Sequence, residues 1–197
     1  MSDHDPVITI DGPSGTGKGT VGLLLAHKLG WHVLDSGAFY RAFAHIAHEQ
    51  HILPEQIDQL RHVGDQLDVR FEVRTDEIRI WVEGRDITAA IRSEEGGRSA
   101  AIYAAIPALL ARQRESRRAP GLVADGRDLG SVVFPDAVLK VFLTATPKVR
   151  AKRRYKQLKD KGFDVNLPRL EKEIAARDYQ DTHRTISPLM PASEAVV

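Results

Sequence analysis

The sequence predicts an α/β protein in which helices flank a parallel β-sheet, with a small antiparallel sheet inserted in the first half of the chain. Three observations lead to this prediction. A short apolar run at residues 7–11 is followed by a helical pattern and a second apolar run, which is the strand–helix–strand order of parallel sheets. Two apolar runs of the same kind return after residue 120. Between them, residues 67–82 have the pattern of an antiparallel hairpin.

The composition is that of an ordinary globular chain. It has 197 residues, 42% of them hydrophobic and 28% charged, which excludes disorder of the whole chain. The net charge of +1 gives no general affinity for polyanions, and the absence of Cys excludes disulfides and Cys-based metal sites. No apolar stretch approaches the length of a membrane span, and the first ten residues lack the pattern of a signal peptide. We therefore expect a cytoplasmic protein without a membrane partner.

The first elements follow from apolar spacing and from helix signals. Val7–Asp11 predicts a buried strand, and Lys18–Leu29 predicts a helix that ends at a glycine. Trp31–Asp35 predicts a second strand. Ser36 is a suitable N-cap residue for a helix over Ala38–Gln50.

The middle of the chain has a different character. Leu67–Val73 and Ile78–Val82 are predicted to pair as a hairpin around a polar turn that contains Asp76. We interpret residues 36–105 as an insertion that carries helices and this small antiparallel sheet.

The last part of the chain again contains apolar runs that are typical of buried parallel strands. Gly121–Asp125 and Val138–Thr144 predict two further strands of the main sheet. Pro147–Lys161 and Leu167–Asp181 predict helices joined by a glycine-containing loop, and Glu194–Val197 resembles the start of another strand.

A glycine-rich loop with the sequence GPSGTGKGT connects the first predicted strand to the first helix. Phosphate oxygens need converging N–H donors, which glycines permit, and the helix N-terminus adds positive partial charge. Lys18 supplies a mobile charge for the β- and γ-phosphates of a nucleoside triphosphate. Gly19 stands where the general motif has Ser or Thr, so Thr20 is the nearest hydroxyl for Mg²⁺, which would be held largely through water. The residues expected to bind the nucleoside triphosphate here are Gly12, Pro13, Ser14, Gly15, Thr16, Gly17, Lys18, Gly19 and Thr20. A turn without a ligand is the alternative.

Three further segments make the pattern specific. They are LDSGAFYRA at residues 34–42, ADGRDLGSVVFPDA at residues 124–137 and KGFDVNLPRLEKEIAARDYQDTHRTISPL at residues 161–189. Together with PVITIDGPSGTGKGT at residues 6–20, they closely resemble bacterial cytidylate kinases, a family of nucleoside monophosphate kinases in which GKGT is the usual form of the loop.

The resemblance implies a P-loop kinase fold with three parts. The core would comprise residues 1–35 and 106–197, residues 36–105 would form an inserted subdomain that binds the monophosphate, and a helical lid would cover about residues 148–165. It also implies direct in-line transfer of the γ-phosphoryl group of ATP to CMP or dCMP, with Mg²⁺ as cofactor. We expect these nucleotides as partners, no nucleic acid, and a monomer. Two alternatives remain, namely another monophosphate or small metabolite as acceptor, and a nucleotide-binding module without catalysis.

The segment after the second predicted strand is expected to bind the acceptor. Ser36, Tyr40 and Arg41 start a helix at the carboxyl end of a strand, where open parallel sheets bind ligands. Ser36 and Arg41 can donate to the acceptor phosphate, and Tyr40 can pack against the ligand. Helix capping by Ser36 and a solvated charge at Arg41 are the simpler alternatives.

The DGRD segment follows a predicted strand. Asp125 is placed to orient Mg²⁺-bound water, and Arg127 to clamp the acceptor phosphate. Asp128 can accept a hydrogen bond from the exocyclic amino group of cytosine, which uracil lacks. A turn held by Asp–Arg pairing is the alternative.

Arginines on the last two predicted helices complete the expected site. Arg177, Asp181 and Arg184 lie at i, i+4 and i+7 on one helix face, and the resemblance implies that they bind the sugar and phosphates of the acceptor. An exposed ion-paired stripe is the alternative.

The lid helix is expected to contact ATP. On it, Arg150 and Arg154 are assigned to ATP binding and Arg153 to catalysis, against the alternative of a solvated basic helix. The full catalytic set is Lys18, Arg127, Arg153 and Arg184.

Two departures from the family pattern bear on base selectivity. After Pro107 a Val-Arg pair of the family is missing, so an arginine expected to contact the base or phosphate is absent unless Arg112 or Arg114 replaces it. Ala101 stands where the family often has Ser, with Ser99 nearby. The family also continues beyond the last residue of this chain.

Overall fold

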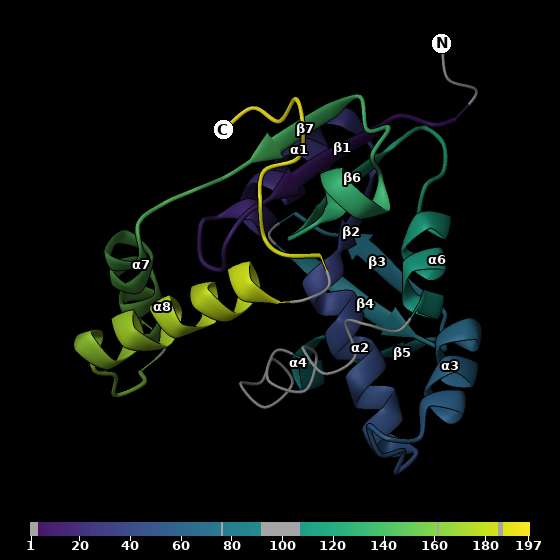
Figure 1. Ribbon diagram of the computed structural model, residues 1–197, viewed down its shortest axis with the longest axis horizontal. Helices are drawn as coiled ribbons and strands as arrows, with labels where there is room; N and C mark the ends of the chain where they lie inside the picture. The colour runs from purple at the N-terminus through teal and green to yellow at the C-terminus, as the bar shows by residue number, and fades with distance from the viewer. Residues whose placement is uncertain (1–3, 76, 92–106, 161, 185–186) are drawn as a thin grey trace.

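A parallel four-stranded sheet forms the centre of the molecule (Figure 1). The computed structural model describes residues 4–75, 77–91, 107–160, 162–184 and 187–197. The strands are β1 (Val7–Asp11), β2 (His32–Asp35), β6 (Leu122–Gly126) and β7 (Leu139–Phe142), in the spatial order β2-β6-β1-β7. All three pairings are parallel, which confirms the predicted sheet and places its strand ends along one edge.

Helices cover the sheet and extend beyond it. Their bounds are α1 (Lys18–Leu29), α2 (Ser36–Glu49), α3 (Ile57–Gln66), α4 (Thr88–Ile91), α6 (Pro107–Glu115), α7 (Pro147–Asp160) and α8 (Leu167–His183). The helices α1 and α2 both pack against β6. The pair α7 and α8 lies side by side to one side of the sheet (Figure 1).

The predicted hairpin is confirmed as part of a second sheet. β3 (Val69–Val73) and β4 (Ile78–Val82) pair in antiparallel register, and β5 (Arg85–Asp86) adds a short third strand. Asp76 of the expected turn lies outside the described residues. Ile80 belongs to the same buried apolar cluster as Leu34 of the central sheet, so one core spans both sheets. The division of the chain at residue 36 stays a prediction.

Two helix ends differ from those expected. The N-cap of α2 is Asp35, whose Oδ1 accepts a hydrogen bond from the Ala38 amide at 2.7 Å, so the prediction of Ser36 is wrong. Both residue types cap helices well, and Asp35 takes the position because the strand ends there. The helix α8 ends at His183, which leaves Arg184 at the C-cap instead of on the helix face.

The chain end reaches the sheet at a single point. Glu194–Val197 forms no strand, and only Val196 makes a parallel bridge, to Val141 of β7. Among the described residues, no helix is both long and apolar enough to cross a membrane.

Candidate active site

The glycine-rich loop wraps the N-terminus of α1 with a backbone that only glycine adopts easily. Gly12 and Gly17 have φ values of 141° and 101°. A Cβ at Gly12 would also collide with the carbonyl oxygen of Leu143. Gly17 is the N-cap of α1 and makes no side-chain cap bond, so the loop leads its backbone directly into the helix N-terminus. This geometry suits an anion.

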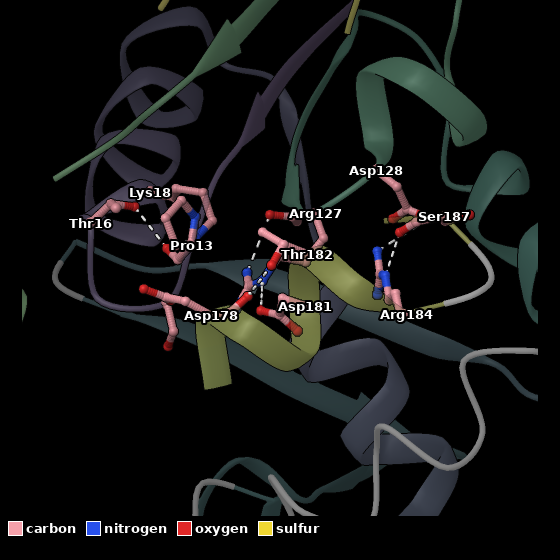
Figure 2. A network of polar contacts seen from close by, with 12 residues as sticks. Pro13, Thr16, Lys18, Arg127, Asp128, Asp178, Asp181, Thr182, Arg184 and Ser187 are labelled. Atoms are coloured by element: carbon pink, nitrogen blue, oxygen red, sulfur yellow. Dashed lines mark hydrogen bonds and ion pairs between the residues drawn. The ribbon is translucent and has the colours of Figure 1, made fainter. Parts of the chain in front are cut away.

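Lys18 lies buried inside this loop (Figure 2). Its Nζ donates a hydrogen bond to the Pro13 carbonyl at 2.8 Å, and the Thr16 hydroxyl donates to the same oxygen at 3.1 Å. Burial, and then the charge of Arg127, lower the pKa of Lys18 to about 8, while nearby carboxylates oppose them. A cation held in this way is poised for a ligand with negative charge.

Carboxylates gather at the edge of the sheet beside the loop. β1 ends at Asp11, β2 ends at Asp35, and Asp125 lies directly across from Asp35 in β6. Burial, and then the charge of Asp35, raise the pKa of Asp125 to about 8, against the effect of Lys18 and two arginines. Sequence reasoning assigned no role to Asp11 or Asp35, although each ends a predicted strand.

Asp11 ties the phosphate loop to the loop that follows β6. Its Oδ1 accepts from the Leu129 amide at 3.0 Å and its Oδ2 from the Gly130 amide at 2.8 Å. These amides open a turn of π-helix at Leu129–Val133, and a Cβ at Gly130 would lie 2.8 Å from the Thr9 hydroxyl. Asp11, which directly precedes the glycine-rich loop, therefore fixes the backbone just after Asp128.

Two ion pairs connect the loop after β6 with the end of α8 (Figure 2). Arg127 Nε donates to Asp181 Oδ2 at 2.7 Å, and Arg184 Nη2 lies 3.8 Å from Asp128 Oδ2. Arg184 Nε also donates to the Ser187 carbonyl. The structure therefore brings together the DGRD segment and the predicted residues of α8.

Buried cationic donors remain available in this cluster. Arg41 pairs with Asp35 at 3.6 Å, yet its Nε makes no hydrogen bond, and neither does Arg184 Nη2, within the described part of the chain. Arg177 lies close by, and desolvation followed by the charge of Arg127 lowers its pKa. Buried donors without acceptors are costly, so the arrangement suits an anion with several oxygens.

Ser36 and Tyr40 are linked by a residue that sequence reasoning missed. Gln113 of α6 is 1% exposed, and its Oε1 accepts from the Ser36 hydroxyl at 2.8 Å. Its Nε2 donates to the Tyr40 hydroxyl at 3.1 Å. The Ser36 hydroxyl uses its single proton in the bond to Gln113. In this arrangement it can only accept, so it does not offer the expected hydrogen bond to an acceptor phosphate. The only sequence signal was a glutamine one helical turn after the buried Leu109.

Neither candidate for the missing arginine faces the site. Arg112 bonds the carbonyls of Gly64 and Asp65, and Arg114 bonds those of Val132 and Val133 at 2.9 and 3.0 Å. Both side chains fasten α6 to its neighbours in this way. Ala101 and Ser99 lie outside the described residues.

The lid arginines have separate roles in the structure. Arg150 is 1% exposed, and it donates to the Ser14 carbonyl at 2.9 Å and to both carboxylate oxygens of Asp178. It therefore fastens α7 and α8 to the phosphate loop through contacts with protein. Arg153 Nη1 donates to the Thr16 carbonyl at 3.2 Å, beside the loop. Arg154 and Thr20 are exposed on α7 and α1.

Comparisons with known proteins agree on one family. The family model described as cytidylate kinase matches residues 8–197. The chain is 53% identical over 201 positions to the cytidylate kinase of Aeromonas hydrophila, covering all of this chain and 87% of that protein. It is 51% identical over 203 positions to the cytidylate kinase of Shewanella denitrificans and 52% identical over 203 positions to that of Nitrosococcus oceani, with 89% of each relative covered. The glycine-wrapped lysine and the arginine cluster beside it thus belong to a chain that is a member of the cytidylate kinase family.

Proposed function

We propose that this chain transfers the γ-phosphoryl group of ATP to CMP or dCMP, giving ADP and CDP or dCDP. One observation carries the proposal. Among the described residues, buried donors of Arg41 and Arg184 make no hydrogen bond. These arginines pair with Asp35 and Asp128, at the sheet edge that also carries the loop around Lys18. Two anions, one in the loop and one in the arginine cluster, would thus meet end to end.

The chemistry needs positioning and charge more than bond-making groups. The acceptor is an ionised phosphate, so it can attack without a general base, and no covalent intermediate is required. Lys18, Arg127 and Arg184 offset the repulsion between the two polyanions, and Arg153 adds charge at the loop. Arg154 would contact ATP from the exposed face of α7. Arg150 would act through its contact with Ser14.

Mg²⁺ fits the carboxylate at the end of β6. The ion commonly takes one or two carboxylates and completes its shell with water and substrate phosphates. Asp125 is a buried carboxylate beside Lys18 and Asp35, and Thr20 follows on the first turn of α1. When bound near Asp125 and Thr20, the ion would supply positive charge that offsets the negative charge of the phosphates.

The remaining residues would hold the acceptor nucleoside. Asp128 would accept a hydrogen bond from the cytosine amino group, and leaving such a buried acceptor unpaired costs about 1–3 kcal/mol. Arg177 would contact phosphate and Asp181 the ribose, while Tyr40 would pack against the ligand.

A coupled assay of ADP release tests the proposal. We expect turnover with CMP and dCMP that exceeds turnover with UMP, AMP and water. Absent turnover with both cytidine nucleotides, or equal turnover with every acceptor, would overturn the substrate assignment. Binding of ATP without transfer to any acceptor would favour a non-catalytic module.

A further inference from the structure

We propose that Gln113 is a positioning residue for base selectivity, because it fixes the direction in which the Ser36 hydroxyl can hydrogen-bond. The inference rests on the proposed function, since it needs a pyrimidine monophosphate as acceptor. Gln113 is 1% exposed and Ser36 is 4% exposed. Because both ends of the Gln113 amide are bonded to hydroxyls of α2, Gln113 would act on a ligand through Ser36 and Tyr40.

The bond lengths set the orientation of the Gln113 amide. The Ser36 Oγ to Gln113 Oε1 distance is 2.8 Å, and the Gln113 Nε2 to Tyr40 hydroxyl distance is 3.1 Å. O–H···O bonds are typically shorter than N–H···O bonds. If the amide were reversed, the 2.8 Å contact with Ser36 would be an N–H···O bond and the 3.1 Å contact with Tyr40 an O–H···O bond. The observed orientation matches the usual lengths better.

This orientation decides what Ser36 can offer to a ligand. A serine hydroxyl has one proton and two lone pairs. Gln113 Oε1 takes the proton, which leaves only acceptor capacity on Ser36. Tyr40 accepts from Gln113, so its own proton remains available to an acceptor elsewhere. The polarity of the whole chain of bonds is set by one buried amide.

Ser36 and Asp128 both border the loop after β6. A Cβ at Gly126 would lie 3.1 Å from the Ser36 Cβ, and Asp128 is two residues further along. Tyr40, one turn after Ser36 on α2, interacts electrostatically with Asp128. A ligand edge placed between Ser36 and Asp128 would therefore meet two acceptors.

Two acceptors fit an amino group and disfavour a carbonyl. The exocyclic amino group of cytosine has two N–H donors, whereas uracil presents an acceptor oxygen at the same position. If the Ser36 hydroxyl were free to rotate, it could donate to that oxygen and uracil would be tolerated. Gln113 prevents this rotation. Arg112 and Arg114 bond backbone carbonyls of neighbouring segments. Selectivity between cytosine and uracil would therefore depend more strongly on the bond between Gln113 and Ser36.

The test compares kcat/KM for CMP and UMP in Gln113→Met. We expect the CMP/UMP ratio to fall about tenfold, partly through improved use of UMP, because the freed hydroxyl can donate to uracil. Gln113→Glu retains an acceptor for Ser36 whether ionised or protonated, so its ratio should stay within about threefold of the wild-type value. The matched control is Gln56→Met, which loses a bond of 2.7 Å from the Leu53 amide at a distant turn and should leave the ratio unchanged.

A double-mutant cycle separates this role from a merely structural one. Ser36→Ala should lower the ratio by itself, and adding Gln113→Met should change it no further, because Gln113 acts through Ser36. Equal losses for CMP and UMP in Gln113→Met would overturn the inference, as would an unchanged ratio in Ser36→Ala. The Ser36→Ala measurement tests the inference even if Gln113→Met does not fold. A wild-type protein that does not phosphorylate CMP would instead overturn the proposed function.

Discussion

Lys18 shows how single residues combine burial with charge in this site. Its ammonium group is kept inside the loop by one hydrogen bond to Pro13 and by nearby carboxylates, although burial lowers its pKa to about 8. We expect Lys18→Ala to lower kcat at least ~100-fold, since a preorganised charge at the reacting phosphate is lost. The far-UV spectrum and melting temperature should stay close to wild type. Wild-type activity in the variant would contradict the role of the loop.

Asp128 is expected to act on selectivity more than on ATP. Asp128→Ala should lower the CMP/UMP ratio of kcat/KM about tenfold, which corresponds to about 1.4 kcal/mol for one lost acceptor. The affinity for a non-hydrolysable ATP analogue, measured by calorimetry, should change little. Asp164→Ala, on the exposed loop between α7 and α8, is the control. An unchanged CMP/UMP ratio would remove Asp128 from the recognition set.

Asp125 links stability to pH. Burial, and then Asp35, raise its pKa from 3.8 to about 8. A raised pKa means that the stability contributed by the protonated group is full below about pH 4 and is lost as pH rises through about 8. Asp125→Asn avoids this loss, so its unfolding free energy relative to wild type should rise by about 1 kcal/mol per pH unit from pH 5 to 7. Urea titrations of the nucleotide-free protein with metal chelated would show this. Parallel curves would contradict it.

The residues that sequence reasoning missed make their bonds over long distances along the chain. Gln113 bonds Ser36 across 77 positions, and Asp11 bonds Leu129 across 118. Local spacing carries no signal for such bonds. Asp125, Arg127 and Asp128 could be assigned because they stand in one short motif after a strand, whereas Asp11 and Asp35 also end strands and were missed.

At the scale of elements, the strand and helix boundaries that were well predicted are those marked by glycines in the sequence. Val7–Asp11 and Lys18–Leu29 match the prediction because a glycine loop separates them and Gly30 ends the helix. The helix α8 runs to His183, beyond the predicted end at Asp181, but the placement of Arg184 on its face was wrong, since Arg184 is the C-cap. Arg184 reaches Asp128 from the cap position instead.

The junction of β1 with the π-helical turn is the element contact that we expect to matter most for the acceptor. In Asp11→Asn one oxygen becomes an N–H donor facing the Leu129 or Gly130 amide, which should cost about 1–3 kcal/mol of stability. Because this turn follows Asp128, KM for CMP should rise more than KM for ATP. Steady-state kinetics with each substrate varied would measure both.

The control for this variant is a similar carboxylate in the small sheet. Asp86 Oδ1 accepts from the Thr88 amide at 3.0 Å, and Asp86→Asn should lower the melting temperature without changing the ratio of the two KM values. Equal increases in both KM values for Asp11→Asn would indicate a general loss of structure and would contradict the proposed link.

For the whole molecule, the order of strands and helices was enough to predict the fold class, whereas the packing between parts was not. Apolar runs and a glycine loop predict a parallel sheet, and alternation predicts a hairpin. Nothing in these patterns indicates that Ile80 of the small sheet joins the same core as Leu34. Nor do they indicate that α7 and α8 are held to the phosphate loop by one buried arginine.

That attachment leads to a prediction about how distant parts act together. Arg150 bonds Ser14 of the loop and Asp178 of α8, so Arg150→Met should release both contacts. Removing one partner of such a pair typically costs about 3 kcal/mol or more, measurable by urea unfolding. The phosphate loop loses a support, so kcat/KM for ATP should fall more than the affinity for CMP.

Arg169→Met is the matched control, because Arg169 forms an exposed pair with Glu173 on the same helix pair and should change stability by less than about 1 kcal/mol. Arg150→Lys retains the charge but not the planar fork that reaches Ser14 and Asp178 together, so it should recover only part of the stability. If Arg150→Met lost stability but kept wild-type kcat/KM for ATP, the pair would be structural alone. If it lost ATP use while remaining as stable as Arg169→Met, Arg150 would instead contact ATP directly, since only a ligand contact could then account for the change.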